Sequence, residues 1–155
     1  MSTPPSSSPL VPADAVAAII VTPDRRFLMQ RRDPLPHIWY PDSWALFGGA
    51  MEAGESELDA LQREVHEEID YTVDPATVRF FSRFHFDIGF AGLPICTRAI
   101  FEVPIAAEAV ATMRLKEGVE MRLIPADEVL TLPRITGYDQ FALYLYLNRD
   151  RIKGR

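Results

Sequence analysis

Three glutamates, Glu64, Glu67 and Glu68, are crowded into the stretch REVHEEID at residues 63–70. If this stretch is helical, Glu64 lies three and four residues before the other two, so all three share one face. Like charges at this spacing cost about 0.2–0.5 kcal/mol per pair, and the negative end of the helix dipole adds about 0.3–1 kcal/mol per acid. An ordinary solvated acidic face is one explanation. Several carboxylates on one rigid element also suit Mg²⁺ or Mn²⁺, which prefer oxygen ligands.

Other metal motifs do not fit this stretch. The residues HEEID at 66–70 are not the zinc motif H-E-x-x-H, because the last position is Asp70. The spacing is also not that of an EF-hand calcium loop. One cysteine, Cys96, and three scattered histidines offer too few ligands for a structural zinc site. The candidate site is therefore one for a hard cation held by carboxylates.

The acids require a rigid helix, and the pattern around them predicts one over Glu57–Ile69. Leu58, Leu61, Val65 and Ile69 recur at spacings of three and four residues, which is one apolar stripe of a helix. Ser56 with Asp59 three residues later resembles a capping box. The predicted strands are Asp14–Thr22, Arg26–Arg31, Ser43–Phe47, Val78–Ile88, Ile95–Val103 and Val119–Ile124, and two further helices are predicted over Ala126–Leu130 and Tyr138–Arg149.

This order of strands and helices predicts an α/β fold in which helices cover both faces of a mixed sheet. The 155 residues fit one domain, expected over residues 13–155, after a Ser- and Pro-rich tail at residues 1–12. The longest apolar run, Ala15–Val21, is far shorter than the roughly 20 residues that span a membrane. A net charge of −6 argues against a broad nucleic-acid surface. We therefore expect a cytoplasmic protein that binds neither membrane nor nucleic acid.

Residues 49–71 closely resemble the Nudix box, Gly-x5-Glu-x7-Arg-Glu-U-x-Glu-Glu-x-Gly-U, in which U is a bulky apolar residue. The extended opening Gly-Gly-x-x-Glu-x-Gly-Glu is also present, from Gly48 to Glu55. One position departs, since Asp70 replaces the last glycine at a point where a left-handed backbone is common. The matching residues are Gly49, Glu55, Arg63, Glu64, Val65, Glu67 and Glu68, with Tyr71 as the final bulky residue.

The resemblance implies an α/β/α sandwich that hydrolyses a nucleoside diphosphate linked to another group, with Mg²⁺ or Mn²⁺ as cofactor. It implies that Arg63 pairs with Glu55 to brace the loop. It also implies a base on the helix, for which Glu67 is the first choice, or an acid on a later loop, for which Glu120 is preferred to Glu117. The implied metal ligands are Glu64, Glu67, Glu68, the Gly48 carbonyl and, through a water, Glu52.

Substrate contacts are expected before and after the box. Trp39, Tyr40 and Trp44 are candidates for stacking on a base or sugar, although core packing explains each one as well. Arg31 and Arg83, together with Arg32, are candidates for phosphate contacts. Nucleoside triphosphates, nucleotide sugars and dinucleoside polyphosphates all stay open as substrates, as does a homodimer.

Two other functions compete with hydrolysis. One is a Nudix-like module that binds a nucleotide without cleaving it, although the intact set of acids argues against this. The other is the isopentenyl diphosphate isomerase branch of the same fold, which needs cysteine and glutamate chemistry that Cys96 alone does not supply.

Overall fold

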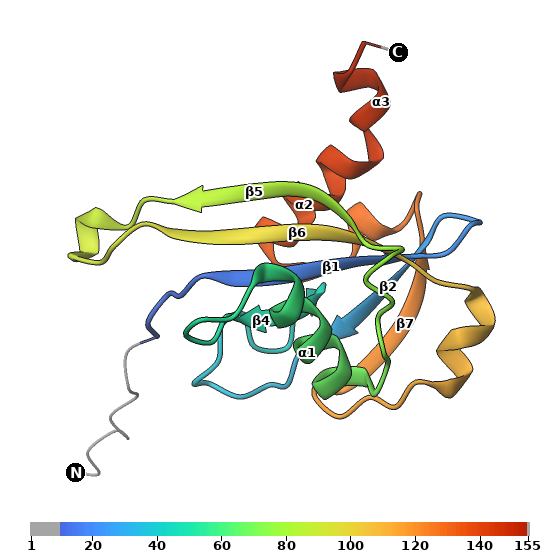
Figure 1. The fold of residues 1–155 in the computed structure, drawn as a ribbon, viewed down its shortest axis with the longest axis horizontal. Helices are drawn as coiled ribbons and strands as arrows, with labels where there is room; N and C mark the ends of the chain where they lie inside the picture. The colour runs from blue at the N-terminus through green and yellow to red at the C-terminus, as the bar shows by residue number, and fades with distance from the viewer. Residues whose placement is uncertain (1–9, 155) are drawn as a thin grey trace.

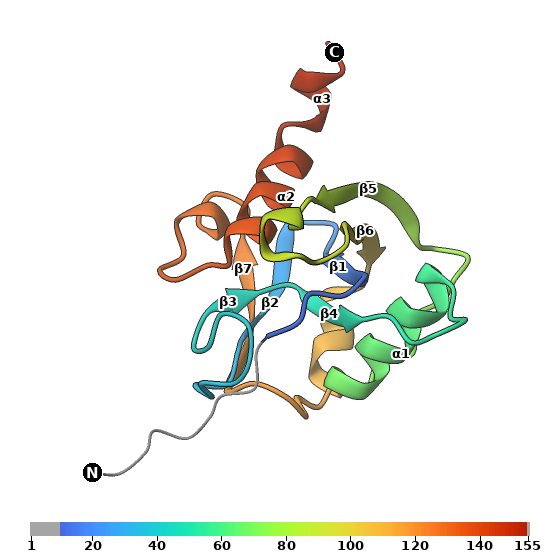
Figure 2. The same ribbon diagram turned by 90° about the vertical axis from the view of Figure 1, so that its left-hand side faces the viewer.

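A mixed seven-stranded sheet lies between helix α1 on one face and helix α2 on the other (Figures 1 and 2). The computed structural model describes residues 10–154, so most of the predicted tail, residues 1–9, lies outside the described residues. The strands are β1 (Ala15–Val21), β2 (Arg26–Arg31), β3 (Trp44–Ala45), β4 (Phe47–Ala50), β5 (Arg79–Phe86), β6 (Cys96–Pro104) and β7 (Glu120–Pro125). The helices are α1 (Glu57–Ile69), α2 (Gly137–Leu147) and α3 (Arg149–Ile152), with short 3₁₀ turns at Gly89–Ala91, Ala107–Thr112 and Val129–Thr131.

The strands follow the order β3-β2-β1-β6-β5, with β4 paired to β1 and β7 paired to β2. Only the β1–β6 pair is parallel among the strand pairs of the described chain, and the others are antiparallel. The prediction of a mixed sheet between helices is therefore confirmed.

Strand β1 contributes to two separate cores. Val16, Ala18 and Ile20 belong to the core under α1, whereas Ala17 and Ile19 belong to the core under α2. Successive side chains of a strand point to opposite faces. Because both faces of this strand are covered, its sequence is continuously apolar instead of alternating.

Helix α1 begins and ends as its sequence predicts. The Ser56 hydroxyl accepts the Asp59 N–H at 3.1 Å and donates to the Asp59 carboxylate at 2.6 Å. Leu61, Val65 and Ile69 are fully buried against the sheet. Asp70 ends the helix in the left-handed conformation, with φ 56° and ψ 36°, where the family box has glycine. The helix that carries the acids is thus held along one side and at both ends.

Some predicted elements differ in the structure. The predicted strand Ser43–Phe47 is divided at Leu46, because the Leu46 N–H donates to the Asp139 carboxylate at 3.0 Å instead of to a neighbouring strand. The predicted helix at Ala126–Leu130 is a 3₁₀ turn at Val129–Thr131. Across residues 10–154, none of the helices combines the length and apolar character needed to span a bilayer.

Candidate active site

Two consecutive glycines bring strand β4 unusually close to its neighbours. Gly48 has φ 140°, and a Cβ added there would lie 2.1 Å from the Val16 carbonyl oxygen on β1. At Gly49 an added Cβ would lie 2.6 Å from a carboxylate oxygen of Glu64 on α1. Non-bonded heavy atoms prefer separations of about 3.5–4 Å, so neither space admits a side chain as the atoms stand. The glycine pair therefore lets the acids of α1 approach the sheet backbone.

Arg63 links the loop after β4 to the acids of α1. Its Nε and Nη2 atoms donate to the two oxygens of Glu55 at 2.7 and 2.9 Å. Its Nη1 atom donates to Glu64 at 2.7 Å and to Glu67 at 3.4 Å. The hydrogen bond from Arg63 lowers the pKa of Glu55 to about 2. The Arg63–Glu55 pair that the resemblance implies is therefore present and fixes the loop to the helix.

Glu64 and Glu68 form the buried part of the acid cluster. The Glu68 residue is 4% exposed, and its carboxylate accepts hydrogen bonds from Gln30 Nε2 at 3.1 Å and from the Gly48 N–H at 3.3 Å. Burial, followed by the charge of Glu64, raises the pKa of Glu68 well above its ordinary value. Burial also raises the pKa of Glu64, although its hydrogen bond with Arg63 acts in the opposite direction. Two such carboxylates hold excess negative charge that a proton or a cation would neutralise.

The other predicted metal ligands are more open to solvent than this pair or meet it through the backbone. The side chains of Glu67 and Glu52 are 54% and 71% exposed, and Gly48 meets Glu68 through its N–H. Within residues 10–154, no three carboxylate, imidazole or thiol groups stand together as a ready cation site. Protein donors hold both buried acids, Arg63 for Glu64 and Gln30 with the Gly48 N–H for Glu68. Their oxygen chemistry and excess negative charge nevertheless fit a hard divalent cation.

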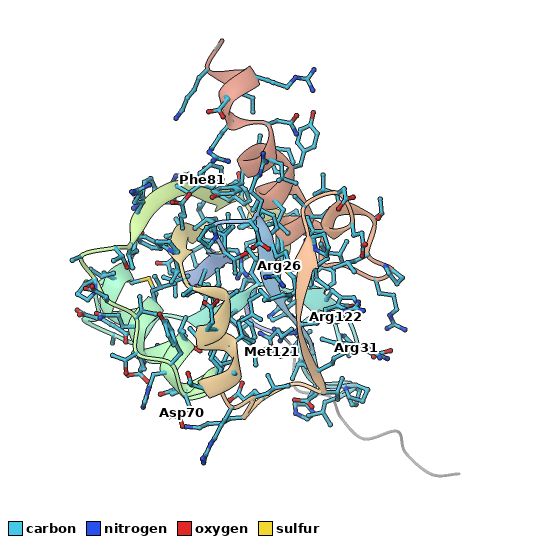
Figure 3. All side chains as sticks on the ribbon, turned by 90° about the vertical axis from the view of Figure 1, so that its right-hand side faces the viewer. Arg26, Arg31, Asp70, Phe81, Met121 and Arg122 are labelled. Atoms are coloured by element: carbon cyan, nitrogen blue, oxygen red, sulfur yellow. The ribbon has the colours of Figure 1, made fainter. Side chains whose placement is uncertain are left out.

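Glu120 faces away from the acid cluster, which corrects its predicted place in the site. It begins strand β7, where Met121 packs against the α1 core and Arg122 stacks on Trp44 at 5.1 Å on the α2 side. Glu120 shares the face of Arg122 because side chains alternate along a strand, and its carboxylate lies 3.9 Å from the Arg122 Nε. Figure 3 shows Met121 and Arg122 along this strand.

Glu117 is the acid of this segment that lies near the cluster. Burial is the main cause of the raised pKa of Glu64 and Glu68, and the negative charge of Glu117 adds to it in both. The loop is attached to the end of α1, since the Lys116 N–H donates to the Glu68 carbonyl at 2.8 Å. The Gly118 N–H donates to Asp33 at 3.0 Å and anchors the other side of the loop.

Two of the three candidate arginines are already paired with acids. Arg31 binds Asp42 at 2.6 Å, and Arg83 binds the two oxygens of Glu57 at 2.9 and 2.7 Å. The Nε of Arg32, by contrast, is buried without a hydrogen-bond partner among residues 10–154. Its charge opposes the rise that burial causes in the pKa of both Glu68 and Tyr138. Arg32 is therefore the arginine placed within electrostatic reach of both the acids and Tyr138.

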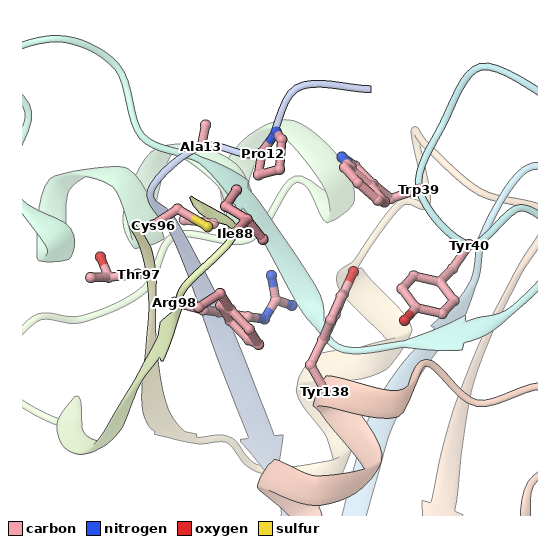
Figure 4. Close-up of a pocket in the computed structure, with 11 residues that line it drawn as sticks. Pro12, Ala13, Trp39, Tyr40, Ile88, Cys96, Thr97, Arg98 and Tyr138 are labelled. Atoms are coloured by element: carbon pink, nitrogen blue, oxygen red, sulfur yellow. The ribbon is translucent and has the colours of Figure 1, made fainter. Parts of the chain in front are cut away.

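An aromatic cavity of about 280 Å³ lies beside Tyr138 (Figure 4). Trp39 and Tyr40, the two candidates for stacking on a base or sugar, line it from the loop after β2, and Tyr40 meets Tyr138 edge-on at 5.2 Å. Arg98 lies 4.4 Å from the Tyr138 ring. Trp44 is corrected to a core residue, because it is only 6% exposed and offers no face for stacking.

Three residues beside the aromatic cavity are not predicted from the sequence as site residues: Arg98, Tyr138 and Asp139. Arg98 binds the fully buried Asp139 at 2.9 Å, and Asp139 also accepts from Thr136 at 2.8 Å. An arginine next to the apolar run Ala99–Phe101 of a predicted strand is a signal for such a site, because arginine is seldom buried without a partner. The partner lies 41 residues away in the sequence and is visible only in the fold.

A glycine pair, an arginine that bridges loop and helix acids, and a mixed sheet between helices together define a Nudix-type domain. The NUDIX domain profile matches residues 11–144, so the chain belongs to the Nudix hydrolase family. This confirms the family that the motif at residues 49–71 predicts.

One known protein resembles this chain in sequence, and two solved structures resemble it in fold. An uncharacterized Nudix hydrolase of Listeria innocua is 27% identical over 125 residues, which is 80% of this chain and 68% of that protein. The MutT protein of Methanosarcina mazei Go1 has a TM-score of 0.71 and 21% identity, covering 93% of this chain and 99% of that one. The NUDIX domain of Shewanella oneidensis NrtR, crystallised with ADP ribose, has a TM-score of 0.66 and 16% identity, covering 97% and 94%. These two structures share the fold of this chain.

Proposed function

We propose that this chain is a divalent-cation-dependent hydrolase that cleaves a phosphoric anhydride bond in a nucleoside diphosphate derivative. The observation that carries the proposal is the position of Arg63, whose guanidinium orders Glu55, Glu64 and Glu67 around one point. The buried carboxylate of Glu68 lies on the same helix face. A helix surface with no further role would gain little from burying two acids against a backbone of glycines.

The proposed cofactor is Mg²⁺, with Mn²⁺ as an alternative of similar ligand preference. Glu64 and Glu68 would hold it, with Glu67 and the Gly48 carbonyl as further oxygen ligands and Glu52 acting through a water. When bound, such a cation neutralises phosphate oxygens and lowers the pKa of a coordinated water. The excess negative charge of the buried acids supports this assignment.

Glu67 is the proposed general base. Half of its side chain is open to solvent, and Arg63 holds one of its oxygens at 3.4 Å, so it can accept a proton from a water above the helix. The oxygen of that water forms a bond to phosphorus, and the bond from phosphorus to the bridging oxygen breaks. The leaving phosphate keeps the electron pair of that bond. Glu117 is the second choice for this role, because its charge acts on the same cluster.

The aromatic cavity is the proposed location of the nucleoside. Trp39, Tyr40 and Tyr138 offer ring faces for a base or sugar. Arg32 lies within electrostatic reach of both the cavity and the acids and would contact the phosphate chain between them. In a chain of net charge −6 this arginine reduces the repulsion that a polyphosphate would otherwise meet. Nucleoside triphosphates, nucleotide sugars and dinucleoside polyphosphates all satisfy this arrangement.

A panel of these three substrate classes, assayed with Mg²⁺ for phosphate or nucleotide release, tests the proposal. Glu67→Gln should lower kcat by about 10²–10⁴-fold, the usual contribution of a general base, without changing the thermal unfolding midpoint. The matched control is Glu128→Gln at an exposed position away from the acids, which should leave kcat unchanged. Near-normal turnover in Glu67→Gln would remove Glu67 from the mechanism. Nucleotide binding without any turnover by the unmodified protein would identify a sensing module instead.

A further inference from the structure

A second cavity, of about 460 Å³, lies at the opposite end of strand β1 from the catalytic groups. Its lining includes Val21, the last residue of β1, and Pro104, the last residue of β6. Gly48 and Gly49, in contrast, pair with Ala17 and Val16 in the first half of β1. Figure 3 views this end of the molecule, where Arg26 and Phe81 are labelled near the turn between β1 and β2. We call it the basic cavity.

The basic cavity carries an excess of positive charge in an otherwise acidic chain. Four cationic side chains line it, those of Arg25, Arg79, Arg149 and Lys153, against the single carboxylate of Glu102. That carboxylate is already occupied, because it accepts hydrogen bonds from Tyr146 and, at 3.4 Å, from Arg79. Neither Arg25 nor Lys153 forms an ion pair within residues 10–154. Three positive charges are therefore left for an anion.

The backbone at Arg25 is a second observation that points to a ligand. Arg25 has φ 60° in the turn between β1 and β2, a left-handed conformation that costs residues with a Cβ about 1–2 kcal/mol. Glycine, asparagine or aspartate would usually occupy this position. Arg25 lines the basic cavity, and residues with strained backbone conformations are concentrated at binding sites. The strain at Arg25 therefore supports a role in ligand binding.

The side of α3 that faces the cavity adds to the same arrangement. Arg149 and Lys153 are four residues apart and share one helix face, whereas Arg151 points about 200° around the helix from Arg149. Arg149 is held in place, with its guanidinium 4.2 Å from the Tyr146 ring centre and a hydrogen bond to the Tyr146 carbonyl at 2.8 Å. The basic cavity thus combines one ordered cation with others that are free to close on a ligand.

We propose that the basic cavity binds a diphosphate group, separately from the acid site and without a metal ion. Guanidinium and ammonium groups converging from a turn, a strand and a helix suit several charged oxygens in a compact volume. The apolar wall formed by Val21 and Phe81 leaves room for an organic group attached to that diphosphate. The diphosphate can therefore come from two sources, inorganic pyrophosphate or a nucleoside diphosphate.

Isothermal titration of the full chain in EDTA, with inorganic pyrophosphate and with ADP as separate probes, tests this proposal. Without a divalent cation the acid site repels inorganic pyrophosphate, so pyrophosphate binding reports on the basic cavity whether or not the chain is a hydrolase. ADP can also enter the aromatic cavity beside Tyr138, so ADP binding is assigned to the basic cavity only as far as substitutions in the basic cavity weaken it. Arg25→Gly/Lys153→Ala should weaken pyrophosphate binding by at least about tenfold, the effect of losing two charge-assisted contacts. The control Arg114→Ala/Arg151→Ala removes the same charge outside the cavity and should stay within about twofold.

Arg25→Gly removes a residue from a strained left-handed position, so the variant should unfold at the same temperature as the unmodified protein or higher. If the double variant unfolds earlier because of Lys153→Ala, the titration of Arg25→Gly alone decides the question. ADP binding that is tighter than pyrophosphate binding and is weakened by Arg25→Gly/Lys153→Ala would identify nucleotides as the source, and equal binding of the two probes would identify the diphosphate group itself. Failure of both probes to bind, or equal weakening in the control variant, would overturn the proposal.

Discussion

Replacing Gly49 with alanine would test directly whether the position of the Glu64 carboxylate controls activity. The added Cβ would lie 2.6, 2.7 and 2.9 Å from Oε2, Cδ and Oε1 of Glu64. Non-bonded contacts of this kind need about 3.5 Å or more, so the carboxylate must withdraw by about 1 Å. That movement would also stretch the 2.7 Å bond between Glu64 and Arg63.

The substitution should lower activity far more than stability. Alanine at an unstrained position stabilises a protein by about 0.4–1 kcal/mol through the unfolded chain, which offsets the loss of one partly exposed ion pair of similar size. We therefore expect the free energy of unfolding to change by less than about 1 kcal/mol. A catalytic group misplaced by 1 Å costs about 100-fold in rate, equivalent to about 2.7 kcal/mol of transition-state stabilisation.

Two measurements on Gly49→Ala are needed, kcat/KM on the best substrate of the panel and urea unfolding. Gly54→Ala is the matched control, because Gly54 has φ 78° and no atoms within 4 Å of an added Cβ. It should lose about 1–2 kcal/mol of stability through strain and keep its turnover. Gly49→Ala with normal kcat/KM and normal stability would refute the reasoning, since the acid could then be displaced without effect.

Two further predictions concern the residues that end helix α1. Asp70→Gly should raise the free energy of unfolding by about 0.5–1 kcal/mol in urea, because glycine is unstrained at φ 56°; a decrease would show that the 3.4 Å pair with Lys116 matters more. In EDTA, thermal stability should fall as pH rises above 4.5, because the raised pKa of Glu68 means that the folded chain binds this proton more tightly than the unfolded chain. Glu68→Gln should reduce that decline, and an identical pH profile would contradict the prediction. Glu55, with a pKa of about 2, affects stability in the opposite direction, because the folded chain holds its proton less tightly than the unfolded chain. The stability that ionised Glu55 contributes is lost as pH falls below 4.5.

The loop and helix that carry the acids could be predicted because local rules agree there. The apolar stripe of α1, its serine cap and the left-handed Asp70 each follow from spacing and residue type over a few positions. The Nudix motif adds the Arg63–Glu55 pair, whose partners are eight residues apart. These features depend little on the rest of the fold.

The position of a side chain cannot be predicted from the sequence where it depends on packing between segments that are far apart in the chain. Helix α2 is apolar on most sides, so its buried face could not be chosen from periodicity, and Phe141 and Tyr144 are exposed while Ala142 and Tyr146 are buried. The side on which Glu120 lies depends on where β7 begins, since a shift of one residue reverses every side chain of a strand. The aromatic cavity joins segments about 100 residues apart, so the sequence offers Trp39 and Tyr40 as stacking candidates but does not indicate Tyr138 as their partner.

Strand β5 ends the sheet, and its outer edge has consequences for how two copies of the chain can meet. The register shifts between Phe80 and Ser82, so the ladder is interrupted along this strand. Arg79 and Arg83 add positive charge to the same edge. Interrupted and charged edges discourage the addition of a further strand from another molecule. A dimer that joins two copies edge to edge through β5 is accordingly disfavoured, and this edge leaves each copy with a sheet of its own.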